Sequence, residues 1–364
     1  MNIGIIGLPQ SGKSTVFNAL SRSGAGSQTS HTGNRYSIGV SKVPDNRVDA
    51  LQRMFHPQKT TYAEVHYLDF LSHRDQPGKF GGFTGEIRNS LEATDTILFV
   101  VRAFDDPSVP HLEGSVNPHR DLDILNLELS YSDLSIIERR LDRLKNEIRI
   151  GKASERMTKT HEREILNRTK AGLEAEIAIR DQELSDFEAA FLEPFKFLTA
   201  KPLLIIWNIS EADSDGVLNI ENGIQERLSG HNVELIVLCG ALEADLTDMD
   251  EEEDQFRVEM GIGESGLVRA IRKSYDLLGM ISFFTVGSDE VKAWTVKRDI
   301  HAVEAAGRIH SDIERGFIRA ETISFDQLIA CGGLSEGRKN GTLRSEGKTY
   351  MVQDGDIINF LFNV

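Results

Sequence analysis

The segment GLPQSGKST, residues 7–15, constrains the fold more than any other part of the sequence. It fits the pattern G-x-x-x-x-G-K-[ST] with Gly7, Gly12, Lys13 and Ser14, and it lies between an apolar run, NIGIIG, and a helical pattern, KSTVFNALSR. In such a loop the backbone N–H groups point inward and bind phosphates, and the following helix adds the positive end of its dipole. The sequence therefore predicts a strand, a phosphate-binding loop and a helix, in this order. A tight glycine turn without a ligand is the alternative, and the position between strand and helix disfavours it.

Further apolar runs extend this pattern along the chain. AEVHYLD (63–69) and TILFVV (96–101) predict two more strands, and PLLIIWN (202–208) and VELIVLC (233–239) predict two that come much later. The helical patterns GEIRNSLEAT and ESGLVRAIRKSYDLL lie among them. Strands that alternate with helices are typical of an α/β domain with a mostly parallel sheet and helices on both faces.

The region between residues 126 and 198 has a helical pattern instead. Apolar residues recur there at steps of three and four: Leu127, Tyr131, Leu134, Ile137, Leu141, Leu144 and Ile148. This spacing favours a long helix packed on a partner helix. The segment IGKAS (150–154) turns the chain, residues 155–180 supply a second helix, and Ser185 with Glu188 predicts a capping box for a third. We interpret residues 126–198 as an α-helical hairpin inserted in the α/β domain; helices packed flat on the sheet are the alternative.

From about residue 281 the sequence consists of short β-rich pieces and glycine turns, such as ISFFTVG and KNGTL. This texture predicts a small separate domain over residues 281–364. The whole chain has 364 residues, of which 40% are hydrophobic and 27% charged, as in ordinary soluble proteins. Two cysteines, Cys239 and Cys331, favour a reducing cytosol over a disulfide framework. No apolar run approaches the roughly 20 residues that span a membrane, so the sequence predicts a cytoplasmic protein without a membrane partner.

The phosphate-binding loop predicts a magnesium site beside it. Lys13 would reach the β- and γ-phosphates of a nucleotide, and the Ser14 hydroxyl would ligate Mg²⁺. The remaining loop positions that we expect to bind the nucleotide are Gln10, Ser11, Gly12 and Thr15. Asp69, at the end of AEVHYLD, fits the carboxylate that contacts Mg²⁺ directly or through water. The alternative for Asp69 is a helix cap or turn residue.

Several longer runs resemble the YchF family of the Obg-related P-loop GTPase group. They are GLPQSGKSTVFNAL, ELSYSDLSIIERRL, FLTAKPLLIIWNISE, CGALEADL, EVKAWTV, AAGRIHSDIERGFIRAETISF and EGKTYMVQDGDIINFLFNV. The resemblance implies a P-loop nucleotide-binding domain (1–125 and 199–280), an inserted helical hairpin (126–198) and a small C-terminal α+β domain of the TGS type (281–364). It also implies that ATP replaces GTP as the ligand, that ATP is hydrolysed slowly, and that the protein associates with the large subunit of the ribosome.

The segment Asn208-Ile209-Ser210-Glu211 bears on the choice of base. Guanine-specific relatives carry Asn-Lys-x-Asp, whose Asp accepts hydrogens from guanine N1 and the 2-amino group. Adenine lacks that amino group and its N1 is an acceptor, and Glu211 is one methylene longer than Asp. Asn208 suits the adenine N7 and 6-amino group, and Ile209 offers apolar cover. Backbone groups near Gly240 and Ala241 would complete the pocket; the alternative for Asn208 is that it only ties loops together.

Two segments depart from the pattern of the family. The family has Asp-x-x-Gly followed by a hydrophobic residue, whereas this chain has Ser72 and then His73 at those positions. A Cβ at residue 72 restricts the backbone motion that glycine allows. His73 either orients the attacking water or is a solvent-exposed loop residue. Thr32 is the nearest candidate for a second Mg²⁺ ligand. Because both segments depart from the family pattern, ATP binding is better supported than hydrolysis. A hydrolysis-deficient nucleotide- or ribosome-binding module and a GTPase stay as alternatives.

The net charge of −16 means that the chain as a whole repels nucleic acid. Basic residues nevertheless gather in two places, on the first hairpin helix and around a turn near the C-terminus: Arg139, Arg140, Arg143, Lys145, Arg149 and Lys152, and Arg338, Lys339, Arg344 and Lys348. They are either solvated surface charges or contacts to ribosomal RNA or tRNA phosphates.

Overall fold

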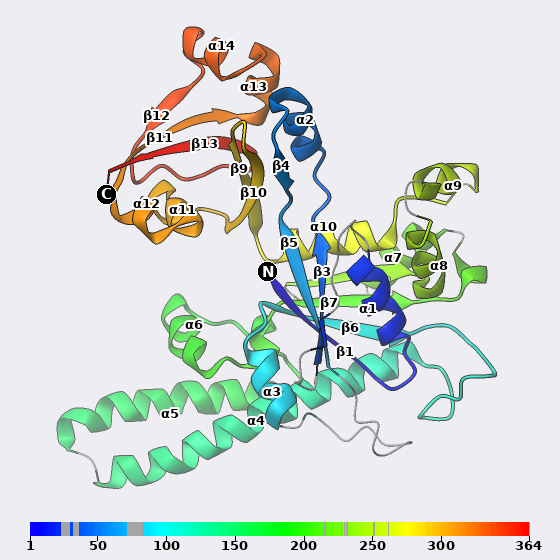
Figure 1. Cartoon of the computed structure of the whole chain (residues 1–364). Helices are drawn as coiled ribbons and strands as arrows, with labels where there is room; N and C mark the ends of the chain where they lie inside the picture. Colours follow the sequence, from blue (N-terminus) through cyan, green and yellow to red (C-terminus); the bar gives the residue numbers. More distant parts are fainter. Residues whose placement is uncertain are drawn as a thin grey trace. The chain divides into compact units, whose positions relative to one another are not determined.

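The structure is a computed structural model that describes residues 1–22, 30–31, 36–70, 83, 85–150, 152–214, 216–226, 228, 230, 232–249, 252–260 and 262–363. The chain folds into two compact units. The α/β unit comprises residues Asn2–Val40 and His66–Arg269. The C-terminal unit comprises Met1, Ser41–Val65 and Ala270–Val364. Each unit is described by itself below (Figure 1).

A seven-stranded sheet forms the centre of the α/β unit, in the order β2-β3-β5-β1-β6-β7-β8. Its strands are β1 (Asn2–Gly7), β2 (Ser30–His31), β3 (Tyr36–Lys42), β5 (Glu64–Phe70), β6 (Thr96–Arg102), β7 (Leu203–Asn208) and β8 (Val233–Leu238). The five strands from β5 to β8 in this order pair in parallel, whereas β2 pairs with β3 antiparallel. Every residue of β6 and β7 is buried, as expected for strands covered on both faces. The predicted α/β fold with a mostly parallel sheet is therefore confirmed.

Helices connect and cover these strands. They are α1 (Lys13–Arg22), α3 (Gly85–Glu92), α4 (Pro118–Ile150), α5 (Ala153–Glu174), α6 (Asp186–Leu192), α7 (Val217–Gln225), α8 (Gly240–Thr247), α9 (Glu253–Glu259) and α10 (Gly266–Leu277), the last of which runs across the boundary between the units. Short 3-10 turns lie at Ile179–Asp181, Glu193–Phe195, Leu198–Ala200 and Glu211–Asp213. The predicted capping box of Ser185 and Glu188 is present at the start of α6.

Helix α4 packs against two different partners along its length. Figure 1 shows α4 and α5 as two long helices that lie alongside each other. The second half of α4 packs on α5 through buried side chains of both helices: Ile137, Leu141, Leu144, Ile165 and Leu166. The first half packs on the sheet through Leu122, Leu125 and Leu129.

The predicted apolar seam was wrong in this first half of α4, and the helix begins at Pro118 instead of residue 126. Leu127 and Tyr131 are 40% and 66% exposed. The face that meets a sheet differs from the face that meets another helix, so a single spacing pattern does not describe both.

A buried carboxylate fixes the chain where α4 changes partner. Asp133 accepts hydrogen bonds from the backbone N–H groups of Leu198 and Thr199, at 3.0 and 2.8 Å, and from the Thr199 hydroxyl at 2.8 Å. Arg88 of α3 donates to the same carboxylate at 3.3 Å. Asp133 therefore connects α3 and α4 to the segment that leads into β7.

The C-terminal unit contains a six-stranded sheet in the order β12-β11-β13-β9-β10-β4. Its strands are β4 (Lys59–Thr61), β9 (Met280–Val286), β10 (Glu290–Lys297), β11 (Phe317–Ser324), β12 (Arg344–Glu346) and β13 (Asp356–Phe362). Its helices are α2 (Asn46–Phe55), α11 (Ala302–Ile309), α12 (Ser311–Arg315), α13 (Phe325–Cys331) and α14 (Leu334–Lys339).

Strand β4 joins this sheet from a distant part of the sequence, because it pairs in parallel with β10. Sequence analysis places residues 41–65 in the domain that begins at residue 1, whereas the structure groups them with the C-terminal unit. The chain thus passes repeatedly from one unit to the other. Among the described residues, no helix combines the length and apolarity needed to cross a membrane.

Candidate phosphate-binding site

The loop between β1 and α1 has the backbone of a phosphate-binding loop. Gln10 and Gly12 have positive φ angles of 65° and 85°, and the Ser11 N–H donates to the Leu8 carbonyl at 3.2 Å. A Cβ on Gly12 would lie 2.2 Å from Nδ2 of Asn208, so only glycine fits there. Val16 N–H donates to the Gly12 carbonyl at 3.0 Å, which begins the helical bonds of α1. The first N–H groups of a helix have no acceptor within the helix, so the start of α1 suits an anion.

The side chain of Asn208 bridges this loop to the start of α8. Its Nδ2 donates to the Ser11 carbonyl at 3.0 Å, and its Oδ1 accepts from the Gly240 N–H at 2.9 Å. A primary amide has two N–H donors and two acceptor lone pairs, so these two bonds use one donor and one lone pair. Asn208 therefore ties the loops together, which was the alternative role, and keeps one donor and one acceptor for a base. Its predicted contact with adenine stays a prediction.

Lys13 and Asp69 lie together at the carboxyl ends of neighbouring strands, since Asp69 is in register with Ile5 of β1. The Lys13 ammonium forms a buried ion pair with the Asp69 carboxylate and donates to the Phe70 carbonyl at 2.9 Å. The sequence placed these two residues in one site, and the structure brings them into direct contact. A phosphate that takes up the Lys13 ammonium has to compete with Asp69 for it.

The oxygen donors near the loop fit Mg²⁺. Ser14 is exposed at the start of α1, and Asp69 adds a carboxylate. Among the described residues no group of three or more His, Cys, Asp or Glu side chains could hold a metal ion by itself. Mg²⁺ in nucleotide sites uses one or two protein oxygens together with water and phosphate oxygens, which agrees with this sparse set. Thr32, Ser72 and His73 lie outside the described residues.

The other residues predicted to contact the base, Ile209, Glu211 and Ala241, differ in how exposed they are. Ile209 is only 5% exposed and packs in the hydrophobic core of the sheet, so little of its side chain is available to cover a base. Glu211 and Ala241 are exposed, and Glu211 begins a 3-10 turn. The roles of these three residues toward a nucleotide stay predictions.

Phe104 and Arg102 belong to this region, and sequence analysis missed them. The Phe104 ring lies 3.8 Å from the position of a Cβ on Gly12. Arg102 holds the ring in place: its guanidinium lies 4.6 Å from the ring centroid, and its Nε donates to the Phe104 carbonyl at 3.2 Å. The signal was their position at the carboxyl end of β6, which Arg102 closes and Phe104 follows. This strand lies between β1 and β7, and ligands bind at the carboxyl ends of such strands.

Comparison with known proteins decides the family. A family model named YchF-GTPase_C, described as "Protein of unknown function (DUF933)", matches residues 280–363. A Bacillus subtilis (strain 168) protein named "Ribosome-binding ATPase YchF" is 38% identical over 375 residues, covering 100% of each chain. This chain belongs to the YchF family. An Escherichia coli O157:H7 protein of the same name is 36% identical over 365 residues, covering 99% of each chain.

A solved YchF structure has the same fold. The Schizosaccharomyces pombe protein, titled "Structure of the Schizosaccharomyces pombe YchF GTPase", superimposes with a TM-score of 0.86 at 29% identity. The match covers 99% of this chain and 97% of that one. The resemblance to YchF proteins that the sequence motifs indicated is thus confirmed over the whole length.

Proposed function

We propose that this YchF-family chain is a Mg²⁺-dependent ATP-binding protein that hydrolyses ATP slowly and acts at the ribosome. The observation that carries the proposal is the full-length similarity to proteins named "Ribosome-binding ATPase YchF", and the loop that contains Gly12, Lys13 and Ser14 supports it.

Catalysis rests on positioning and charge neutralisation, with no covalent intermediate. The loop amides and the first turn of α1 bind the β- and γ-phosphates, and Lys13 neutralises the charge that develops on the transferred group. Ser14 would hold Mg²⁺, with Asp69 acting directly or through water. The ion supplies further neutralisation of phosphate charge when bound. His73 is proposed to orient the attacking water.

Adenine selectivity follows from the groups left on Asn208. Its second Nδ2 hydrogen and second Oδ1 lone pair suit the N7 acceptor and 6-amino donor of adenine. Glu211 replaces the Asp that guanine-specific relatives carry, at an exposed position where its longer chain does not present two oxygens to a guanine edge.

GTP is the second candidate ligand, because the solved relative is titled a GTPase. We test the choice by calorimetric titration of nucleotide-stripped protein with Mg-ATP and Mg-GTP, followed by measurement of phosphate release. We expect tighter binding of ATP and slow turnover that Lys13→Ala removes. Equal or stronger binding of GTP would overturn the adenine assignment, and absence of turnover would leave a nucleotide-binding module. Lys145→Ala, an exposed change on α4, is the matched control and keeps wild-type nucleotide binding and phosphate release in the absence of ribosomes.

For the ribosome, we propose the basic face of α4 as an RNA contact. Arg140 forms ion pairs with Glu162 and Glu147, at 2.6 and 3.0 Å, whereas Arg139 and Arg143 are exposed. The double variant Arg139→Ala/Arg143→Ala should weaken co-sedimentation with large ribosomal subunits and reduce its salt dependence, since each lost phosphate contact lowers the salt slope. Unchanged co-sedimentation would exclude this face. The C-terminal basic residues are in part paired, Arg338 with Glu321 and Arg344 with Glu346, and they stay a second candidate.

A further inference from the structure

A second cavity lies in the α/β unit, away from the phosphate-binding loop. It has a volume of about 680 Å³ and is bounded by one face of α4, the segment after α5, and the beginnings of β7 and β8. Leu203, the first residue of β7, lines it, whereas Asn208 at the other end of β7 contacts the phosphate-binding loop. Ile205 also lines the cavity and is the lining residue of β7 nearest to Asn208, so at about 3.3 Å per residue the strand separates the two sites by roughly 10 Å. The cavity is therefore a different site from the nucleotide site.

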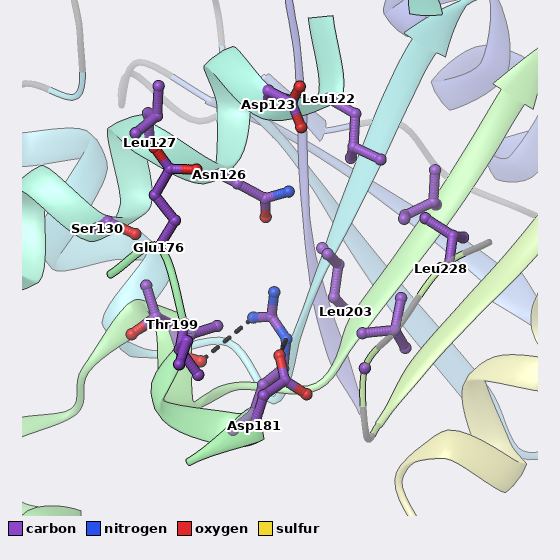
Figure 2. A pocket seen from close by; sticks show the side chains of 16 residues that line it. Leu122, Asp123, Asn126, Leu127, Ser130, Glu176, Asp181, Thr199, Leu203 and Leu228 are labelled. Atoms are coloured by element: carbon purple, nitrogen blue, oxygen red, sulfur yellow. Dashed lines mark hydrogen bonds and ion pairs between the residues drawn. The ribbon is translucent and has the colours of Figure 1, made fainter. Parts of the chain in front are cut away.

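The floor of the cavity is apolar. It is formed by side chains of α4, of β7 and β8, and of the segment between α7 and β8: Leu122, Leu203, Ile205, Leu228 and Val233. Leu228 and Val233 are half-buried, whereas the other three are buried. Figure 2 shows Leu203 and Leu228 on the side of the cavity opposite Asn126 and Leu127 of α4. The volume lies within the range of small-molecule pockets, about 300–1,000 Å³.

A buried arginine with an unused donor forms part of the wall. The Arg180 side chain is only 5% exposed, and burial lowers the pKa of its guanidinium. Its Nη1 donates to the carbonyls of Thr199 and Lys201, at 3.2 and 3.3 Å. Its Nε has no hydrogen-bond partner among the described residues, and the Asp181 carboxylate is 3.8 Å away. A buried N–H without a hydrogen-bond acceptor costs free energy, and the Asp181 carboxylate, an ion-pair partner beyond hydrogen-bond distance, offsets this cost only in part.

Carboxylates lie at the rim of the same cavity. Asp123 of α4 and Glu176, which follows α5, both line it and are exposed. Figure 2 shows the Asn126 amide pointing from α4 into the space between these acidic residues and Asp181. These acids outnumber Arg180, which disfavours a phosphate or another polyanion and favours a ligand with a positive group.

We propose that the cavity binds a small zwitterion with an apolar side chain, namely an apolar α-amino acid. Its carboxylate accepts from Arg180, since a guanidinium is suited to a planar carboxylate. Its ammonium group faces Asp123 and Glu176. Its side chain lies on the apolar surface that the half-buried Leu228 and Val233 provide. The carboxylate, the ammonium group and the apolar side chain of the ligand thus match Arg180, the rim carboxylates and the apolar floor of the cavity.

The test removes one ligand group at a time, using the full-length wild-type protein. Calorimetric titration compares leucine with 4-methylpentanoate, which lacks the ammonium group, and with isoamylamine, which lacks the carboxylate. We expect leucine to bind and each truncated compound to bind at least tenfold more weakly, about 1.4 kcal/mol. No binding of leucine at millimolar concentration overturns the proposal. Isoamylamine binding as tightly as leucine also overturns it and indicates a cation site.

Two variants locate the binding in this cavity. Glu176 has a φ angle of 60°, which glycine adopts more easily, so Glu176→Gly removes the carboxylate without straining the backbone. We expect it and Arg180→Gln each to weaken leucine binding by roughly tenfold. Asp142→Asn, an exposed change further along α4, is the control and should leave binding unchanged. Leucine binding that Glu176→Gly does not weaken would place the ligand elsewhere.

Discussion

Gly12 has both a positive φ angle and a neighbouring side chain that leaves no space for a Cβ. Its φ angle is 85°, and the amide of Asn208 fills the place of a Cβ. Gly12→Ala should therefore lower ATP affinity at least tenfold, because the loop has to move away from Asn208, and should cost about 1–3 kcal/mol in the free energy of unfolding. Calorimetry and urea unfolding measure the two effects.

Gly114→Ala is the matched control for this prediction. Gly114 also has a positive φ angle, 76°, but no atom lies within 4 Å of a Cβ there. The control should lose a similar stability and keep its ATP affinity. Equal losses of affinity in both variants would show that backbone strain alone, without the contact to Asn208, determines nucleotide binding.

Asp69 competes with phosphate for the Lys13 ammonium. Asp69→Asn removes the buried ion pair and one negative charge next to the loop. Without Mg²⁺ the variant should bind ATP about tenfold more tightly than wild type, since 1.4 kcal/mol of competition is a modest value for a buried pair. With Mg²⁺ its phosphate release should fall. Titration in EDTA measures the first effect, and weaker binding there would contradict the competition.

Cys239 precedes the first residue of α8, beside the Asn208 bridge. Burial raises the pKa of its thiol, so less thiolate is present at a given pH than in an exposed cysteine. In a Cys331→Ser variant, modification of Cys239 by a thiol reagent should be slow at neutral pH and should accelerate as pH rises toward the raised pKa. A rate at pH 7 equal to that of a free thiol in an unfolded control would contradict this.

At the scale of elements, residues 13–22 show how far sequence reasoning reaches. The helical pattern KSTVFNALSR coincides with α1 at both ends, because loop chemistry fixes its start and the apolar spacing fixes its face. The first half of α4 was predicted less well, since the sheet and α5 require different faces of one helix. Strand β4 has only three residues, and its pairing partner β10 lies more than 200 residues later in the sequence, since Lys59 pairs with Glu290. No local sequence pattern therefore predicts this strand.

The same limit applies to the candidate site. Lys13 could be placed from the sequence by the loop motif, and Asp69 and Asn208 because each lies at the end of a recognisable strand. Arg102 and Phe104 also lie at the end of a strand, but the contact between them is a side-chain packing that strand position alone does not specify. The direct ion pair of Lys13 with Asp69 depends on strand order, which a single sequence gives only indirectly.

Asp133 connects α4 to the segment before β7, and its loss should lower the stability with which the whole of α4 packs on the sheet. Asp133→Ala leaves two backbone N–H groups, the Thr199 hydroxyl and part of Arg88 without their acceptor. We expect a loss of about 3–5 kcal/mol in the free energy of unfolding. Urea unfolding compares it with Asp142→Ala, exposed on the same helix, which should change stability by less than about 0.5 kcal/mol. Similar stability of both variants would show that the buried carboxylate contributes little.

At the scale of the whole molecule, the C-terminal unit is assembled from two distant parts of the chain. Arg47 of α2 connects them: its guanidinium donates to the Asp354 carboxylate at 2.7 Å and lies 5.1 Å from the centroid of the Phe284 ring. Asp354 in turn accepts from the Ser282 N–H of β9 at 2.9 Å. The segment Ser41–Val65 is therefore a structural part of this unit, although most of the unit follows residue 270.

Arg47→Ala tests whether the two parts of the unit share their stability. Loss of the ion pair and of the cation–π contact should cost about 1–3 kcal/mol. Hydrogen exchange should then accelerate in α2, β9 and β13 together, while β6 and β7 of the α/β unit keep their protection, since the units have separate cores. Arg53→Ala is the control on α2, because the Arg53 guanidinium donates to the carbonyl of Asp49 in its own helix and to no other group among the described residues. Faster exchange confined to α2 would show that residues 41–65 are an appendage, and equal acceleration in β6 and β7 would show that the chain unfolds as a single cooperative body.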